Sequence, residues 1–136
     1  MGLAQKRIIQ EFQTTEFQKW KTDFDKVVGF EMPMEVKWDT LQSNDSESKV
    51  DYFRWYNQVY FSPLMKVFTA LCADSMGKDA VKGAVKKIVI DGTDGIYASS
   101  STFDNGTLHI KHKFDSNTHK EDERIEVWTK LVESKL

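Results

Sequence analysis

The sequence predicts an α+β fold in which about four to five helices pack on one face of a small, mainly antiparallel sheet. Apolar residues recur with a helical period in several segments between residues 15 and 88. Between residues 88 and 114 they alternate with polar residues, which is the period of strands. Separate runs of helices and of strands along a chain are typical of the α+β class. The second region therefore predicts a three-strand meander over residues 88–114.

A first helix is predicted over residues 15–28. Its apolar side chains lie three and four residues apart: Phe17, Trp20, Phe24, Val27 and Val28. Thr14 can cap the start, and Gly29 can supply the left-handed residue that ends many helices. The preceding stretch, residues 7–12, fits either a strand or an earlier helical turn.

A strand is predicted over residues 32–38, after the first helix. Apolar residues alternate there with other types: Met32, Met34, Val36 and Trp38. Pro33 cannot donate a hydrogen bond to a neighbouring strand, so it belongs at a sheet edge or at the start of a strand. This segment is therefore a candidate fourth strand at an edge.

Further helices are predicted between residues 48 and 88. Ser48 and Asp51 resemble a capping box and begin one helix. Ser62 and Pro63 supply a new cap and a proline suited to a first helical turn, so we expect the helix to break there. The two helices that follow have these apolar faces: Leu64, Val67, Phe68 and Leu71 in one, and Val81, Ala84, Val85 and Ile88 in the other.

The helix after Ser48 carries more aromatic side chains than a single core contact requires. Tyr52, Phe53, Trp55, Tyr56, Val59 and Tyr60 cover an arc of about 160° at 100° per residue. One interpretation is a central helix between the sheet and other helices. The other is that part of the arc, at Trp55 or at Phe61, stays exposed to bind a partner, since aromatic residues supply much interface binding energy.

The dipeptide Asn105–Gly106 favours a two-residue hairpin turn, which fixes the register of the last two strands. The pairs expected on the core face are Phe103 with Leu108, Ser101 with Ile110, Ser99 with His112, and Tyr97 with Phe114. The opposite, polar face is expected to hold Thr102 with His109, Ser100 with Lys111, and Ala98 with Lys113. The hydrophobic pattern selects this register, because a shift by one residue would exchange the two faces.

The three histidines lie close in sequence but are predicted to occupy separate environments. His109 and His112 point to opposite sides of the sheet, so they cannot share a metal ion. His112 is expected to be a buried, neutral imidazole bonded to Ser99 or to a carbonyl, and His109 a solvated strand residue. His119 is expected at the first position of a last helix, which Thr118 and Glu121 would cap. We predict no metal site.

The last helix is predicted to bury Ile125, Trp128, Leu131 and Val132. Elsewhere, residues 91–95, "DGTDG", lack the distal glutamate of a calcium loop and indicate a turn. The remaining segments match no phosphate loop and no nucleophile elbow. The sequence therefore predicts no cofactor and identifies no catalytic residue.

Composition limits the broad class of protein. The 136 residues are 40% hydrophobic and suit a single globular domain, 1–136. The formal net charge of -2 disfavours nucleic-acid binding. No apolar stretch is long enough for a membrane span or a signal peptide, and a lone cysteine, Cys72, fits a reducing compartment. We expect a soluble, cytoplasmic protein.

The leading functional hypothesis is a small protein-interaction domain that catalyses no reaction. Its candidate contact residues are Tyr52, Trp55, Tyr56 and Phe61 on the aromatic helix, or Thr102, His109, Lys111 and Lys113 on the polar sheet face. The alternative is a small-molecule-binding or enzymatic domain with a site between sheet and helices, lined by Tyr97, Ser99, Ser101 and His112. The partner of the interaction domain is expected to be another protein or a second copy of the chain.

Overall fold

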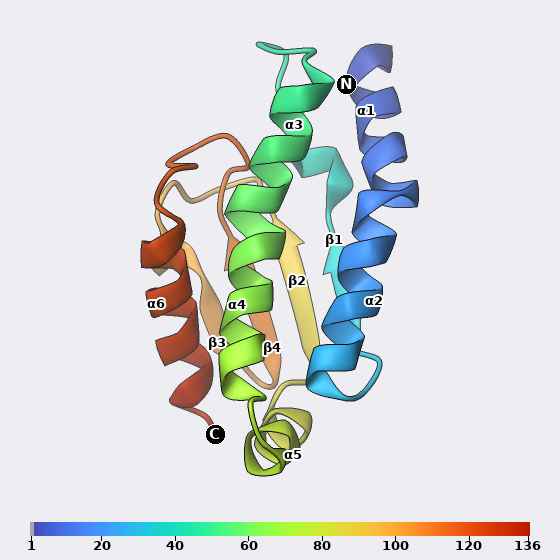
Figure 1. Cartoon of the computed structure of the whole chain (residues 1–136). Helices are drawn as coiled ribbons and strands as arrows, with labels where there is room; N and C mark the ends of the chain where they lie inside the picture. Colours follow the sequence, from blue (N-terminus) through green and yellow to red (C-terminus); the bar gives the residue numbers. More distant parts are fainter. Residues whose placement is uncertain (1) are drawn as a thin grey trace.

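The computed structural model describes residues 2–136, in which α-helices cover one face of a four-stranded sheet (Figure 1). The α-helices are α1 (Leu3–Thr14), α2 (Glu16–Val28), α3 (Lys49–Tyr56), α4 (Ser62–Leu71), α5 (Ser75–Ala84) and α6 (Glu121–Glu133). The strands are β1 (Met34–Val36), β2 (Lys87–Asp91), β3 (Thr102–Asp104) and β4 (Thr107–Lys111). Short helical turns lie at Trp38–Thr40 and Ala98–Ser100, and a π-helix lies at Asn57–Phe61. None of the helices within residues 2–136 combines the length and the apolar character needed to cross a membrane.

The strand order is β1-β2-β4-β3, and the sheet is mixed. Strand β2 runs parallel to both β1 and β4, and only β3 and β4 pair antiparallel. The α+β class and the packing of helices on one face are confirmed, as is the edge position of the strand around Met34. The prediction of a mainly antiparallel meander over residues 88–114 is wrong.

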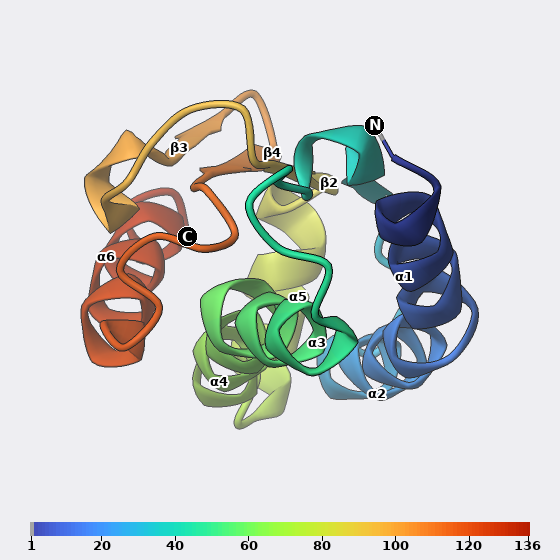
Figure 2. The same ribbon diagram turned by 90° about the horizontal axis from the view of Figure 1, so that it is seen from above.

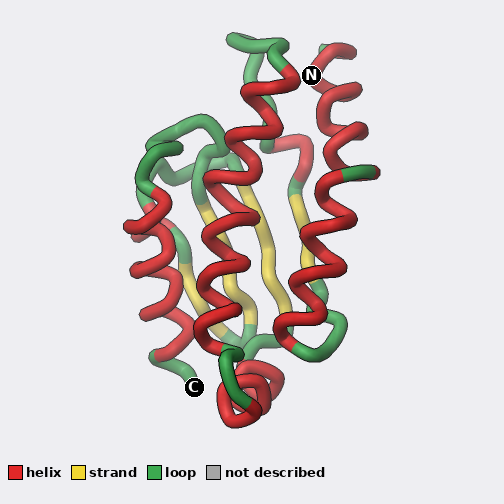
Figure 3. Tube along the Cα trace, viewed as in Figure 1, coloured by secondary structure: helices red, strands yellow, loops and turns green. Residues whose placement is uncertain are grey.

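The meander fails because the chain after β2 does not turn back at residues 92–95. It continues past the end of β4 and then forms β3 on the far side of that strand (Figure 3). Lys113 N donates to Gly95 O at 2.7 Å, and a Cβ on Gly95 would lie 2.4 Å from Lys111 O. Glycine with φ +90° thus allows this close approach to the end of β4. A turn motif in the sequence predicts that the chain changes direction, but it does not predict which strands pair on either side of it.

The hairpin at Asn105–Gly106 is confirmed, with φ 51° and 80° at its two central residues. Phe103 pairs with Leu108 and Thr102 pairs with His109, as predicted. The predicted strand from residue 96 is wrong, because Ala98–Ser100 form a 3-10 turn and β3 begins only at Thr102. The pairs expected of Ser101, Ser99 and Tyr97 are therefore absent from the ladder between β3 and β4.

Two of the predicted helix limits are confirmed. Helix α2 ends at Val28 before Gly29, whose φ is 85°. Ser48 caps α3, where its Oγ accepts a hydrogen bond from Asp51 N at 3.3 Å. The ambiguous stretch 7–12 belongs to α1. The predicted capping box of the last helix is wrong, since Glu121 instead accepts hydrogen bonds from Ser62 Oγ and Lys66 Nζ.

The break predicted at Ser62 and Pro63 is also wrong, because α3 and α4 continue into one another through the π-helix. A proline ring would clash with the carbonyl four residues earlier in an α-helix. The wider π turn relieves that clash, and Ser62 N donates to Asn57 O, five residues back. The next hydrogen bond between residues five apart would join Pro63 N to Gln58 O, but proline has no N–H to donate. Arg124 of α6 replaces it, since its Nη2 donates to Gln58 O at 3.0 Å.

The aromatic helix is mostly buried, which confirms the interpretation of a central helix. Tyr52, Tyr56 and Tyr60 lie one turn apart and are all inaccessible to solvent. Tyr52 Oη donates to Ser43 O at 2.7 Å, Tyr56 Oη donates to Leu41 O, and Tyr60 Oη donates to His112 O. Burial raises the pKa of Tyr60 well above its usual value. These bonds fasten the helix to the loops that follow β1 and β4.

Candidate functional site

One face of the sheet, which we call the outer face, is not covered by any of the α-helices within residues 2–136. Seen from above, the six α-helices lie on the other side of the strands (Figure 2). Inner residues of the two central strands, Ile88, Ile90, Leu108 and Ile110, are inaccessible to solvent. We define the outer face by the residues whose pairing puts them opposite these inner residues: Glu35, Lys87, Val89, Asp91, Thr102, Asp104, Thr107, His109 and Lys111. We add Lys37 and Lys113, which follow β1 and β4 and continue their alternation.

The half of the outer face on β1 and β2 is electrostatically paired. Lys87 Nζ donates to Glu35 Oε1 at 2.8 Å, and Lys37 Nζ lies 3.6 Å from Asp91 Oδ2. The hydrogen bond and charge of Lys87 lower the pKa of Glu35. Burial raises the pKa of Asp91, but the Thr93 hydrogen bonds and the charge of Lys37 outweigh it, so the net pKa is lowered. Both acids of this half are therefore ionised and matched by lysines.

The half on β3 and β4 contains lysines without such partners. We call Lys111 and Lys113 the lysine row, because alternate residues of an extended chain point to the same side. Between residues 2 and 136, no carboxylate lies within 4.0 Å of either Nζ. Buried Ile110, His112 and Phe114 alternate with half-buried Lys111 and exposed Lys113, so the alternation continues past the end of β4.

His109 lies beside this row on the outer face. Its Nε2 is buried and lies 3.8 Å from Asp91 Oδ2, beyond hydrogen-bonding distance. Burial lowers the pKa of His109, the positive charges of Lys111 and Lys37 lower it further, and Asp91 opposes them without reversing the net shift. The neutral imidazole is thus favoured, and the solvated strand residue predicted from the sequence is only half-exposed.

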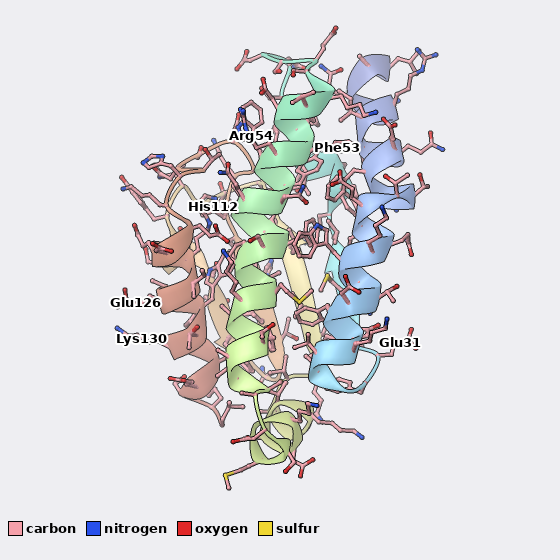
Figure 4. All side chains as sticks on the ribbon, viewed as in Figure 1. Glu31, Phe53, Arg54, His112, Glu126 and Lys130 are labelled. Atoms are coloured by element: carbon pink, nitrogen blue, oxygen red, sulfur yellow. The ribbon has the colours of Figure 1, made fainter. Side chains whose placement is uncertain are left out.

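The aromatic candidates do not form an exposed patch. Tyr52, Tyr56 and Phe61 are buried. Trp55 is half-buried, with its ring centroid 5.7 Å from that of Phe114 and 6.1 Å from that of Tyr52. Figure 4 shows the adjacent Phe53 and Arg54 leaving α3 on opposite sides. Only part of the Trp55 ring is available for contact with another molecule.

The four residues of the alternative pocket do not share one environment, because two are exposed and two are buried. Tyr97 is 50% exposed and Ser99 is exposed, whereas Ser101 and His112 are buried. The indentation lined by Tyr97, His112 and Arg124 has a volume of about 0 Å³, so it holds no ligand as it stands. Ser101 Oγ accepts a hydrogen bond from Lys111 N at 3.2 Å, which makes it part of the strand end.

His112 itself is placed as predicted, on the core side of the sheet. It is 1% exposed, and its Nδ1 lies 2.7 Å from Lys113 O. In Figure 4 it lies between α6 and the central helix, whereas Glu126 and Lys130 point outwards from α6. Burial lowers the pKa of His112. The carbonyl is the partner, and Ser99 is not.

A polar groove of about 440 Å³ lies at the carboxyl ends of the parallel strands β1, β2 and β4. Its walls come from the loops after those strands: Asp39, Thr40, Gln42, Ser43, Asp45, Gly92, Thr93, Lys113, Phe114 and Asp115. Gly92 N donates to Thr40 Oγ1 at 2.8 Å, which joins two of the loops. Ligands of open sheets with parallel strands usually bind at this end.

Sequence reasoning missed Arg124, which is 1% exposed and organises the loop before α6. Its guanidinium donates to Asn117 O at 2.7 Å, Thr118 O at 2.8 Å and Gln58 O at 3.0 Å. Burial lowers its pKa, but an arginine stays charged. The available signal was its position four residues before Trp128, on the buried stripe of the last helix.

The part of the chain that the structure describes brings together no group of three or more His, Cys, Asp or Glu side chains able to hold a metal ion. Comparisons with models of protein families, with curated proteins and with solved structures found no match.

Proposed function

We propose that the protein is a non-catalytic protein-interaction domain that binds its partner through the outer face of the sheet. The observation that carries this proposal is the unequal covering of the two faces, because α-helices bury one and leave the other to solvent. The aromatic residues of α3 are mainly used in the core, so they contribute little exposed area. A cytoplasmic location is part of the proposal, and the single free cysteine, Cys72, supports it.

The outer face has the mixed character of a reversible interface. Charged and hydroxyl side chains surround Val89, whose own side chain is small and well shielded by its longer neighbours. Non-obligate interfaces are about as polar as the rest of a protein surface, and they keep their shape on binding when rigid elements carry them. A sheet fixed from behind by buried isoleucine and leucine side chains meets the second condition.

A steric substitution tests the proposal without presuming the charge of the partner. Thr102 is exposed on β3, so Thr102→Trp should cover the area around His109 with an indole ring and prevent contact. Thr69→Trp, on the exposed side of α4, is the matched control. Affinity capture from the native cells with quantitative mass spectrometry should show partners lost only in Thr102→Trp, while Trp55→Ala keeps them.

The captured partner must then be shown to occupy the outer face. Addition of the purified partner to the ¹⁵N-labelled protein should shift the amide resonances of β2, β3 and β4 and leave those of α5 unchanged. The proposal would be abandoned if Thr102→Trp kept every partner, or if the shifts fell on the helices. Should the captured partner be the chain itself, light scattering would report a dimer that Thr102→Trp dissociates.

The groove at the carboxyl ends of the strands favours a second candidate function, the binding of a polar small molecule. Its volume of about 440 Å³ falls in the range of ligand sites, and hydrogen-bonding groups dominate its walls. Gln42 Oε1 is buried among described residues without a hydrogen-bond partner, and a ligand with donor groups would satisfy it. This site would replace the one expected at Tyr97, Ser99, Ser101 and His112.

Titration with spermidine, as a donor-rich probe, tests this candidate. Calorimetry should detect binding that the pair Asp45→Asn and Asp115→Asn weakens, while Asp79→Asn and Asp104→Asn, both away from the groove, leave it unchanged. Equal weakening by both pairs would show only a general attraction of charge and would remove the groove as a specific site.

A further inference from the structure

We propose that the partner of the outer face is an acidic, extended protein segment that lies along β4 and is held by Lys111 and Lys113. This inference rests on the function proposed above, and it adds the chemistry of the partner. It depends on the difference between the two halves of the outer face, which use their charges in opposite ways.

The acids of the half on β1 and β2 are already paired with lysines. Its two carboxylates are each matched by a lysine, at 2.8 Å for Glu35 with Lys87 and at 3.6 Å for Asp91 with Lys37. Asp91 also accepts a hydrogen bond from Thr93 N at 2.8 Å. A partner that approached this half would have to displace existing contacts, so electrostatic attraction to it is weak.

The lysine row differs because its charges are unmatched among residues 2–136. The pKa of His109 is lowered first by burial and then by the positive charge of Lys111, so Lys111 acts on this point of the face. Asp104, at the far end of β3, is the acid of this half on the defined face. Asp39, Asp45 and Asp115 line the adjacent groove with Lys113, but none of their carboxylates lies within 4.0 Å of its Nζ. Charge complementarity therefore favours an acidic partner over a basic one.

The spacing of the row selects an extended partner. Residues two apart in a strand lie about 6.8 Å from each other on one face, since each residue rises about 3.4 Å. An extended segment with carboxylates at alternate positions has the same repeat and can match Lys111 and Lys113 together. A helical segment presents neighbouring side chains at i and i+4, about 6 Å apart along its axis, but on a curved surface that cannot follow β4 closely.

Short synthetic peptides test the chemistry before any natural partner is known. The acidic probe is a capped peptide of alternating Glu and Thr. The comparison probes are a neutral peptide of alternating Gln and Thr, a basic peptide of alternating Lys and Thr, and oligothymidylate. At about 20 mM salt the acidic peptide should shift the amides of β4, and the effect should fall strongly at about 200 mM salt. Shifts of the same size with the neutral or basic peptide would contradict the inference. Stronger binding of the oligonucleotide would replace it with nucleic-acid binding.

Charge reversal supplies the second arm. Lys111→Glu with Lys113→Glu should weaken binding of the acidic peptide and of the captured partner about tenfold, as loss of two exposed ion pairs and new repulsion imply. The matched control, Lys78→Glu with Lys82→Glu on exposed positions of α5, should leave both unchanged. An unchanged affinity in the Lys111 and Lys113 variant would overturn the inference.

The two proposals fail in distinguishable ways. If Thr102→Trp abolishes capture of the natural partner but the double charge reversal does not, the outer face is an interface and its partner is not acidic. If neither variant alters capture, both proposals are wrong. If both variants abolish capture and the two controls do not, both are supported.

Discussion

The two faces of the sheet differ although the same strands form them. On β4, Leu108 and Ile110 are inaccessible to solvent, whereas the residues between and beside them, Thr107, His109 and Lys111, are half-buried. The inner side chains are fixed by contacts with the helices, so their identity is set by packing. The outer ones have no such constraint. The outer residues can therefore change without loss of the fold, because the packed inner face keeps the sheet rigid. Such a surface is suited to binding.

The largest expected effect lies on the covered side, at Arg124. Arg124→Ala removes one donor from each of three carbonyl groups. Of these, Asn117 O keeps a hydrogen bond from Lys120 N, while Gln58 O and Thr118 O lose the side-chain donor. Buried polar groups left without partners are costly, so we expect a loss of about 3–5 kcal/mol in the free energy of unfolding. Urea denaturation followed by circular dichroism measures it.

Pro63→Ala provides the control for this explanation. The new N–H at position 63 can donate to a carbonyl of the preceding turn, so it should recover part of the stability lost in Arg124→Ala. Strictly additive effects of the two substitutions would show that Arg124 does not compensate for the proline.

The next largest effect separates the two faces directly. Leu108→Ala on the inner face should cost about 2–5 kcal/mol, because it removes a fully buried side chain and leaves a cavity. Thr107→Ala, the adjacent residue on the outer face, should cost less than about 1 kcal/mol. Equal losses in denaturant titrations would mean that both faces are packed, and the comparison would break down.

Sequence reasoning was most accurate where the pattern is local. The hairpin at Asn105–Gly106, the helix end at Gly29 and the core-side position of His112 depend on turn chemistry and alternation within a few residues. The parallel pairing of β2 with β4 depends on residues 92–101 passing the end of β4, which no local pattern encodes. Likewise the local pattern at Pro63 predicts a helix break, because the compensation comes from Arg124, 61 positions further along the sequence.

The same limit applies to the candidate site. Alternation correctly put Thr102 and His109 on one face with Lys111, because strand parity is a local property. It could not show that Glu35 and Asp91 already have lysine partners, since those pairs cross from β1 to β2. The difference between the paired half and the lysine row therefore becomes visible only in the structure.

A pH titration compares one histidine from each face. Burial lowers the pKa of both His112 and His109 in the folded protein. The unfolded chain then binds protons more readily as the pH falls through about 6.5, so stability falls with decreasing pH, by at most about 1.4 kcal/mol per pH unit for each group. His112→Gln should flatten the dependence of the free energy of unfolding between about pH 7 and pH 5 more than His109→Gln. The reverse order would show that the outer histidine is the more strongly buried one.

The smallest expected effect is the one on which the interaction proposals depend. Lys111→Glu with Lys113→Glu should change the free energy of unfolding by less than about 1 kcal/mol, because neither side chain has a carboxylate partner to lose among the described residues. Thermal unfolding by calorimetry measures this change. A larger loss would mean that the lysine row stabilises the strand end, and weaker binding in this variant could then reflect unfolding. A small change makes the row dispensable for the fold, so any effect on affinity belongs to recognition.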